Sequence, residues 1–260
     1  MKAITSRDNP LYKELKNLAS SSQVRRKSGR TLLDGIHLCQ AYWQHLGPPQ
    51  LCVVSESSRT HHEVELIVEQ CLAKATQIIC LPDALYQALS QVEHGIGLMF
   101  IIATPNPEFP LKLNASSVIL DNLQDPGNLG SILRSAAAAG IENVFCSIGT
   151  AFAWSPKVMR AGMGAHFLLN IFENVNLQSL LLNTEIPILA TSSHATKTIY
   201  QVNLNQPVAW LFGHEGQGVA EDLMALAKQT VTIPQRPEIE SLNVAASAAI
   251  CFFEQVRQSL

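Results

Sequence analysis

Residues 121–134 read Asp121-Asn122-Leu123-Gln124-Asp125-Pro126-Gly127-Asn128-Leu129-Gly130-Ser131-Ile132-Leu133-Arg134. An apolar run from Ser117 to Asp121 comes first and predicts a buried strand, and Pro126 suits the first turn of a helix. A strand that turns directly into a helix presents free backbone N–H groups, which suit an anion. Arg134 adds a planar cation suited to phosphate, although most helical arginines are solvated ion-pair residues.

Strands and helices alternate after this stretch. The helix that opens near Pro126 is expected to continue to Ala139 and to stop at Gly140. A final helix is predicted from Asn243 to Arg257, with small residues near its start. Further strands are predicted at Asn143–Cys146, Ile186–Thr191, Pro207–Phe212 and Thr230–Ile233. The alternation predicts an α/β domain with a largely parallel sheet.

A second stretch places three glycines after an apolar strand. It reads Trp210-Leu211-Phe212-Gly213-His214-Glu215-Gly216-Gln217-Gly218-Val219. Glycine lets the backbone turn and approach a ligand closely, although a glycine-rich turn alone is more often structural. The spacing is not that of a dinucleotide fingerprint, and no phosphate-loop Lys-Ser/Thr follows it. A nucleotide-dependent α/β enzyme is therefore disfavoured.

A third stretch leads into the last helix through a loop restricted by two prolines. It reads Ile233-Pro234-Gln235-Arg236-Pro237-Glu238-Ile239-Glu240-Ser241-Leu242-Asn243-Val244-Ala245-Ala246-Ser247. Either Ser241 or Asn243 can cap the helix that follows. Capping alone is an adequate local explanation for both residues.

The first hundred residues also read as an α/β layer, and a proline-rich segment separates them from the rest. Strands are predicted at Leu51–Ser55, Gln77–Leu81 and Gly97–Ala103, and helices at Ile36–His45, His62–Ala73 and Pro82–Leu89. Three prolines between Thr104 and Pro110 indicate a stiff linker. We therefore expect a first domain at 1–104, a linker at 105–113 and a second domain at 114–260.

Composition bounds the class of protein. The chain has 260 residues, of which 47% are apolar and 15% charged, values typical of two compact domains. Its formal net charge is −3, yet the first thirty residues carry +6 and the remainder −9. The basic segment could steer a polyanion to one end of the molecule, or it could be a solvated, flexible terminus.

No metal, targeting or membrane segment is expected. The six cysteines form no C-x-x-C pair and sit in apolar segments, so we interpret them as reduced core residues. The histidines form no H-E-x-x-H pattern. No apolar run approaches the ~18 residues of a membrane span, which predicts a cytoplasmic protein.

Together, the three stretches closely resemble the signature motifs of the SpoU (TrmH-type) RNA 2′-O-ribose methyltransferases, a family of the SPOUT superfamily. The resemblance covers Val118 to the C-terminus. Its motifs are Asn128-x-Gly130-x-x-x-Arg134, Gly213-x-Glu215-x-x-Gly218 and Glu240-Ser241-Leu242-Asn243-Val244. Ser155 to Ala161, followed by Gly164-Ala165, is similar to a further family segment. Leu32 to Leu38 resembles the family's ribosomal-protein-like substrate-binding domain, over a shorter and less specific match.

The resemblance implies a C-terminal trefoil knot that binds a bent S-adenosylmethionine, in a homodimer whose active sites draw on both chains. It implies cofactor contacts, largely through the backbone, at Thr191, Gly213, Gly218, Ile233 and Leu242. The implied catalytic residues are Arg134, Asn128, Glu215, Ser241 and Asn243. A guanidinium is a poor base, so Arg134 either activates the ribose hydroxyl or positions it with the 3′-phosphate.

The substrate implied is structured RNA, with ribosomal RNA of the 23S type favoured over transfer RNA by analogy with family members that carry such a first domain. The residues expected to bind RNA are Arg7, Lys13, Arg25, Arg26, Lys27 and Arg30. The sequence departs from the family at Gln235 and Pro237, where Met and Gly are common, and at Gly162, where Ser is common. The departures at Gln235 and Pro237 keep open a catalytically silent RNA-binding member as the alternative.

Overall fold

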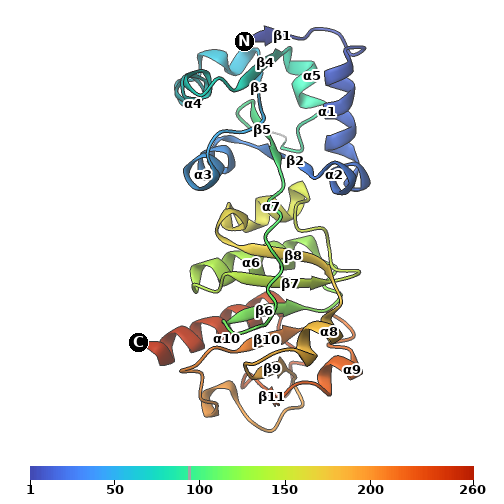
Figure 1. The fold of residues 1–260 in the computed structure, drawn as a ribbon, viewed down its shortest axis with the longest axis vertical. Coiled ribbons are helices and arrows are strands. Elements are labelled where there is room, and N and C mark those ends of the chain that lie inside the picture. The colour runs from blue at the N-terminus through green and yellow to red at the C-terminus, as the bar shows by residue number, and fades with distance from the viewer. Residues whose placement is uncertain (93–94) are drawn as a thin grey trace. The chain divides into compact units, whose positions relative to one another are not determined.

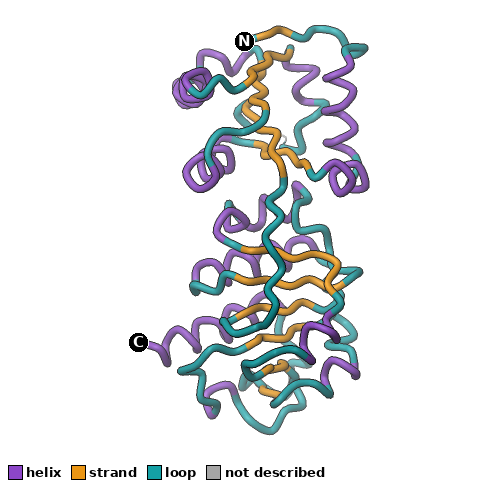
Figure 2. The backbone as a smooth tube through the Cα atoms, in the orientation of Figure 1, coloured by secondary structure: helices purple, strands orange, loops and turns teal. Residues whose placement is uncertain are grey.

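The structure is a computed structural model that describes residues 1–92 and 95–260. Its contacts divide into two compact units, one of residues 1–105 with 154–167, the other of residues 106–153 with 168–260. Figure 1 labels the elements of both, and Figure 2 distinguishes helix, strand and loop. The domain ranges 1–104, 105–113 and 114–260 stay a prediction, since the segment 154–167 falls within the third of them.

The first unit is built on a mixed five-stranded sheet in the order β1-β4-β3-β5-β2, with β2 and β3 antiparallel to β5. Its strands are β1 (Lys2–Ala3), β2 (Arg30–Asp34), β3 (Leu51–Ser55), β4 (Gln77–Leu81) and β5 (Leu98–Ala103). Its helices are α1 (Pro10–Ser20), α2 (Ser22–Ser28), α3 (Ile36–Leu46), α4 (His62–Ala73), α5 (Asp83–Gln87) and α7 (Pro156–Gly162). The strands and helices predicted for this part are present within two residues at each end.

The basic N-terminal segment is folded in this unit. Helix α1 opens at an Asn9 cap and buries Tyr12, Leu15 and Leu18 against the sheet. Helix α2 follows after one residue and ends at Gly29, which adopts a left-handed φ of 59°. The interpretation of this segment as a flexible terminus is therefore wrong, because its apolar stripe belongs to the core.

The segment 154–167 joins the first unit through contacts with β2 and α3. The Thr31 hydroxyl donates to the Trp154 carbonyl at 2.8 Å, and the rings of Tyr42 and Phe167 meet edge to face at 5.3 Å. Ser155 caps α7 by accepting from the Val158 N–H. These contacts, distant in the sequence, explain why the segment packs with residues 1–105.

The second unit is built on a six-stranded sheet whose pairings are all parallel, in the order β11-β9-β10-β6-β7-β8. Its strands are β6 (Ser117–Leu120), β7 (Asn143–Ser147), β8 (Asn170–Val175), β9 (Ile188–Thr191), β10 (Ala209–Phe212) and β11 (Gln229–Val231). Its helices are α6 (Pro126–Ala138), α8 (Leu177–Leu182), α9 (Glu221–Met224) and α10 (Val244–Ser259). The α/β prediction with a parallel sheet is confirmed.

The side chains of β10 point alternately to the two faces of the second sheet. Ala209 and Leu211 belong to a core cluster that also holds residues of α8 and α9. Trp210 lies on the other face, where its Nε1 donates to Gln255 of α10 at 2.8 Å. Helix α6 packs against α10 on this second face. The sheet is thus covered on both sides, as a parallel sheet requires.

Candidate active site

The three stretches lie at the carboxyl edge of the second sheet. Strands β9, β10 and β6 are parallel neighbours, so they end at the same edge. The first stretch leaves β6 there and opens α6, while the second leaves β10. Thr191 is the last residue of β9, and Ile233 lies two residues beyond the end of β11.

Glu215 joins the second stretch to the first. Its carboxylate accepts hydrogen bonds from the backbone N–H of Asp125 at 3.0 Å and of Gln124 at 3.3 Å, and from Asn128 Nδ2 at 3.1 Å. Partial burial raises the pKa of Glu215, but the hydrogen bonds from Asn128, its own backbone, Asp125 and Gln124 together lower the pKa below its usual value. The site therefore favours the ionised carboxylate.

Asn128 carries the connection on to the third stretch. Its Oδ1 accepts a hydrogen bond from Asn243 Nδ2 at 2.9 Å, while its Nδ2 donates to the Glu215 carboxylate. Asn243 Oδ1 caps α10 by accepting from Ala245 N at 2.9 Å and Ala246 N at 3.2 Å. Of the two caps that the sequence allowed, the structure uses Asn243. A continuous chain of hydrogen bonds, Asn243 to Asn128 to Glu215, thus links all three stretches.

The turn after β10 is closed by its own backbone. The N–H of His214 donates to the Gly218 carbonyl at 2.9 Å, and the Gly218 N–H donates back at 2.8 Å. A Cβ on Gly213 would lie 2.2 Å from backbone atoms of Gly218 and Val219, so no side chain fits there. Asp121 Oδ2 holds the far end of the turn by accepting from Ala220 N at 3.0 Å.

Arg134 and Ser241 stand apart from this network. Arg134 lies on the exposed side of α6, and its side chain has no hydrogen bond or ion pair within residues 1–92 and 95–260. Ser241 is exposed, and its hydroxyl is likewise unpaired in the described part of the chain. Both are available to a substrate.

Gln235, one of the departures from the family pattern, has a local structural role. Its Nε2 donates to the carbonyl of Ile239 at 2.9 Å and to that of Glu240 at 3.3 Å. The Ile239 N–H also donates to the Arg236 carbonyl across Pro237. Gln235 therefore helps to close the loop that precedes Ser241. Leu242, which is half-buried, follows Ser241.

Among the basic residues of the first unit, Arg25 differs from the others. Its side chain is buried, and its Nη1 donates to the carbonyls of Leu18 and Ala19 at the end of α1 at 2.7 and 2.9 Å. Arg7, Lys13, Arg26 and Lys27 are exposed. Arg30 is partly buried, with ion-pair contact to Glu14. The expectation that Arg25 binds RNA is therefore wrong, because its side chain is buried and its Nη1 caps α1.

His214 and Asp121 hold the site together, yet sequence reasoning gave neither of them a role. Asp121 carried a usable signal, because a polar residue at the end of a buried parallel strand meets the neighbouring loops. His214 carried a weaker one, its place directly after Gly213.

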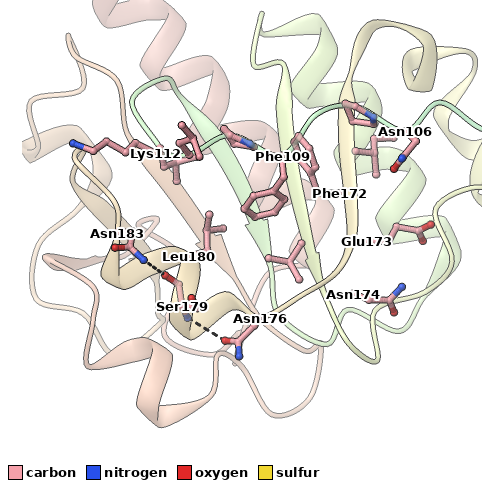
Figure 3. Close-up of a pocket in the computed structure, with 16 residues that line it drawn as sticks. Asn106, Phe109, Lys112, Phe172, Glu173, Asn174, Asn176, Ser179, Leu180 and Asn183 are labelled. Carbon is pink, nitrogen blue, oxygen red and sulfur yellow. Dashed lines mark hydrogen bonds between the residues drawn. The ribbon is translucent and has the colours of Figure 1, made fainter.

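A cavity of about 460 Å³ lies elsewhere in the second unit. It is bounded by the segment 106–113, by β8 and by α8, and Phe109, Asn174 and Asn183 are among its lining residues (Figure 3). Phe109 sets its ring edge-on against Phe145 and Phe172 there. The lining includes none of the three motifs, so this cavity is distinct from the candidate site.

All six cysteines are buried, and none forms a disulfide bond in the described part of the chain. Within residues 1–92 and 95–260, no three His, Cys, Asp or Glu side chains are grouped so as to hold a metal ion. None of the helices in that same range has both the length and the apolar character needed to span a bilayer.

Comparison with known proteins identifies the family. Residues 115–253 match the model of the SpoU rRNA methylase family. The chain belongs to this family. The resemblance predicted from the three motifs is thereby confirmed.

Relatives match this SpoU-family chain over nearly its whole length. An uncharacterized tRNA/rRNA methyltransferase of Synechocystis is 32% identical over 98% of this chain and 94% of its own. The 23S rRNA (guanosine-2′-O)-methyltransferase RlmP of Bacillus subtilis is 28% identical over 97% and 98%. A crystal structure of an RNA 2′-O ribose methyltransferase superposes with a TM-score of 0.80 at 29% identity, covering 98% of each chain.

Proposed function

We propose that this protein transfers the methyl group of S-adenosylmethionine to a ribose 2′-hydroxyl in structured RNA, and that the RNA is ribosomal, of the 23S type. The observation that carries the proposal is the hydrogen-bonded chain from Asn243 through Asn128 to Glu215, which brings the three family motifs to one sheet edge. The substrate follows the relatives, since RlmP of Bacillus subtilis is named for 23S rRNA, and a mouse relative, 30% identical over 93% of this chain, is named rRNA methyltransferase 3, mitochondrial.

The sheet edge fits a methyl donor held by backbone groups. Thr191, Gly213 and Ile233 end or follow neighbouring parallel strands, and Leu242 precedes the cap of α10. Gly213 has no space for a side chain, and Gly218 has a left-handed φ of 74°, so only glycine suits this turn without strain. These five residues would hold the donor, which supplies a methyl group already activated on a sulfonium.

The polar residues have distinct roles in this proposal. Arg134, exposed and unpaired, positions the 3′-phosphate and the 2′-hydroxyl of the ribose. Ser241 orients these groups, Asn243 holds the loop that carries Ser241 against Asn128, and Asn128 braces the first turn. Glu215 orders that turn through the backbone N–H groups of Gln124 and Asp125. Alignment of the hydroxyl behind the methyl group is then the main contribution to the rate.

RNA binding is assigned to exposed basic residues of the first unit. Arg7, Lys13, Arg26 and Lys27 lie on or near α1 and α2, with Arg30 at the start of β2. Base edges in A-form RNA are poorly accessible, so these residues would contact phosphates and recognise shape.

A homodimer with composite active sites, the trefoil knot and a cytoplasmic location stay predictions. Light scattering at micromolar concentration tests the dimer.

Two measurements test the function. Calorimetric titration with S-adenosylmethionine separates an enzyme from a silent RNA-binding member, in which binding would be absent or very weak. Mapping 2′-O-methyl groups in ribosomal and transfer RNA, with and without the protein, then identifies the substrate. A new methyl group on transfer RNA alone would replace the ribosomal assignment, and none on either RNA would reject the function.

A further inference from the structure

The imidazole of His214 bonds back onto the turn that follows it. Its Nδ1 accepts hydrogen bonds from the backbone N–H of Gly216 at 2.9 Å and of Gln217 at 3.1 Å. The backbone of His214 is also bonded in both directions to Gly218. One residue therefore fixes the positions of the next four, including Glu215.

These two bonds require one protonation state. An imidazole nitrogen accepts a hydrogen bond only when it carries no proton, so His214 must be neutral with its hydrogen on Nε2. The imidazolium form has a donor at Nδ1, which would then face two further donors. Proton uptake at Nδ1 would therefore replace two attractive interactions by repulsion and release the turn.

The turn acts on the site through Glu215 and Gly218. Glu215 holds the N–H groups of Gln124 and Asp125 together with the Asn128 amide, so displacement of the turn would loosen the first motif as well. We propose that His214 is a positioning residue, whose neutral imidazole keeps the donor site assembled, so that binding of S-adenosylmethionine weakens when the imidazole takes up a proton. The identity of the ligand rests on the proposed function.

Most charged groups on the segments that contact this turn are acidic, with Arg134 of α6 as a cation among them. The first motif, which the turn contacts, contributes Asp121 and Asp125, the turn itself contributes Glu215, and α9 opens with Glu221 and Asp222. Asp121, Asp125 and Glu215 each accept backbone N–H donors in the structure. Glu215 also has a lowered pKa, so it stays ionised over the range in which histidine side chains change charge, about pH 5 to 8.

Two substitutions at position 214 distinguish the need for a hydrogen-bond acceptor there from the effect of its protonation. In His214→Asn, the amide Oδ1 is placed to accept the N–H two residues on, as in an Asx turn, and it takes up no proton in this range. His214→Ala removes both hydrogen bonds. At about pH 8 we expect the Asn variant to bind S-adenosylmethionine within a fewfold of wild type, and the Ala variant about 30-fold more weakly, from two hydrogen bonds of ~1 kcal/mol each.

The decisive readout is calorimetric affinity for S-adenosylmethionine at pH values from about 8 down to about 5.5, with folding checked by circular dichroism. Affinity should fall with pH in wild type and stay level in the Asn variant. The same fall in both proteins, or wild-type affinity in the Ala variant, would overturn the proposal. If the Ala variant does not fold, the Asn profile still decides. Wild type that binds no donor at any pH would instead reject the proposed function.

Discussion

At the scale of single residues, the site divides into side chains that hold the motifs together and side chains left free for substrate. The side chains of Asn128, Glu215 and Asn243 hydrogen-bond to one another and to backbone groups. Arg134 and Ser241 are exposed on the outside of that network. Substitutions in the two groups should therefore affect different steps.

Replacing Arg134 by Ala should reduce methyl transfer at least a hundredfold, while affinity for S-adenosylmethionine stays within about twofold, because among the described residues the Arg134 side chain makes no hydrogen bond or ion pair with the donor-binding turns. Single-turnover methylation and donor calorimetry measure the two effects. Lys157→Ala, which removes an exposed cation of α7, is the matched control and should leave both unchanged. Near-normal turnover in the Arg134 variant would reject the assigned role.

Replacing Glu215 by Gln should weaken donor binding, measured by calorimetry, roughly tenfold, because an amide offers one acceptor oxygen where the carboxylate offers two.

The lowered pKa of Glu215 also predicts how stability depends on pH. Stabilisation by Glu215 is complete above the ordinary carboxyl pKa, about 4.5, and is lost as the pH falls through the lowered folded-state value. Wild type should therefore melt above the Gln variant at neutral pH, and the two melting temperatures should converge in acid. A constant difference down to about pH 3 would contradict this.

At the scale of elements, helix caps fix where the motifs begin. Asp125 Oδ1 caps α6 by accepting from Asn128 N at 2.8 Å, and Asn243 caps α10. Because α6 packs against α10, the two capped ends come together and their asparagines pair. Asn243 thus both caps the start of α10 and joins the first and third motifs.

Asn243 allows these two roles to be separated. Asn243→Ala should remove both, at a cost of about 1 kcal/mol in unfolding free energy. Asn243→Asp should keep the cap and its stability, but its carboxylate cannot donate to Asn128 Oδ1, so methyl transfer should fall by tenfold or more. Denaturant unfolding and methylation rates measure the two effects. If the Asp variant were as active as wild type, the link to Asn128 would have no part in catalysis.

At the scale of the whole molecule, charge is segregated along the chain. The first thirty residues carry +6 and the remainder −9, and the exposed residues Arg7, Lys13, Arg26 and Lys27 lie on or near helices α1 and α2. Deleting this segment would remove Tyr12, Leu15 and Leu18 from the core, so truncation would test folding and not RNA binding. Surface substitutions are the suitable probe.

Arg26→Gln with Lys27→Gln should weaken RNA binding at low salt and reduce the slope of log affinity against log salt by about 0.7–0.9 for each phosphate that the variant no longer neutralises. Donor affinity should not change. Filter binding from about 50 to 200 mM salt measures the slope. Lys74→Gln, an exposed lysine just beyond α4, is the control. An unchanged slope would place the RNA surface elsewhere.

The sequence by itself determined the family, the α/β class and most elements of the second sheet. These depend on apolar periodicity, glycine and proline positions and caps, which act within a few neighbouring residues. It did not predict β8, whose polar residues Asn170, Glu173 and Asn174 and left-handed φ of 57° at Asn174 interrupt the alternation. Here a strand is formed by pairing with β7, which no local pattern contains.

Only the tertiary structure decided where particular side chains go. The charge count could not separate Arg25, whose guanidinium caps α1, from exposed Arg26. Neither the bonds of His214 to its own turn nor the contact of Asn128 with Asn243 follows from spacing. Parallel strands deliver loops more than a hundred residues apart to one edge, and the direction of each hydrogen bond is set only when those loops meet.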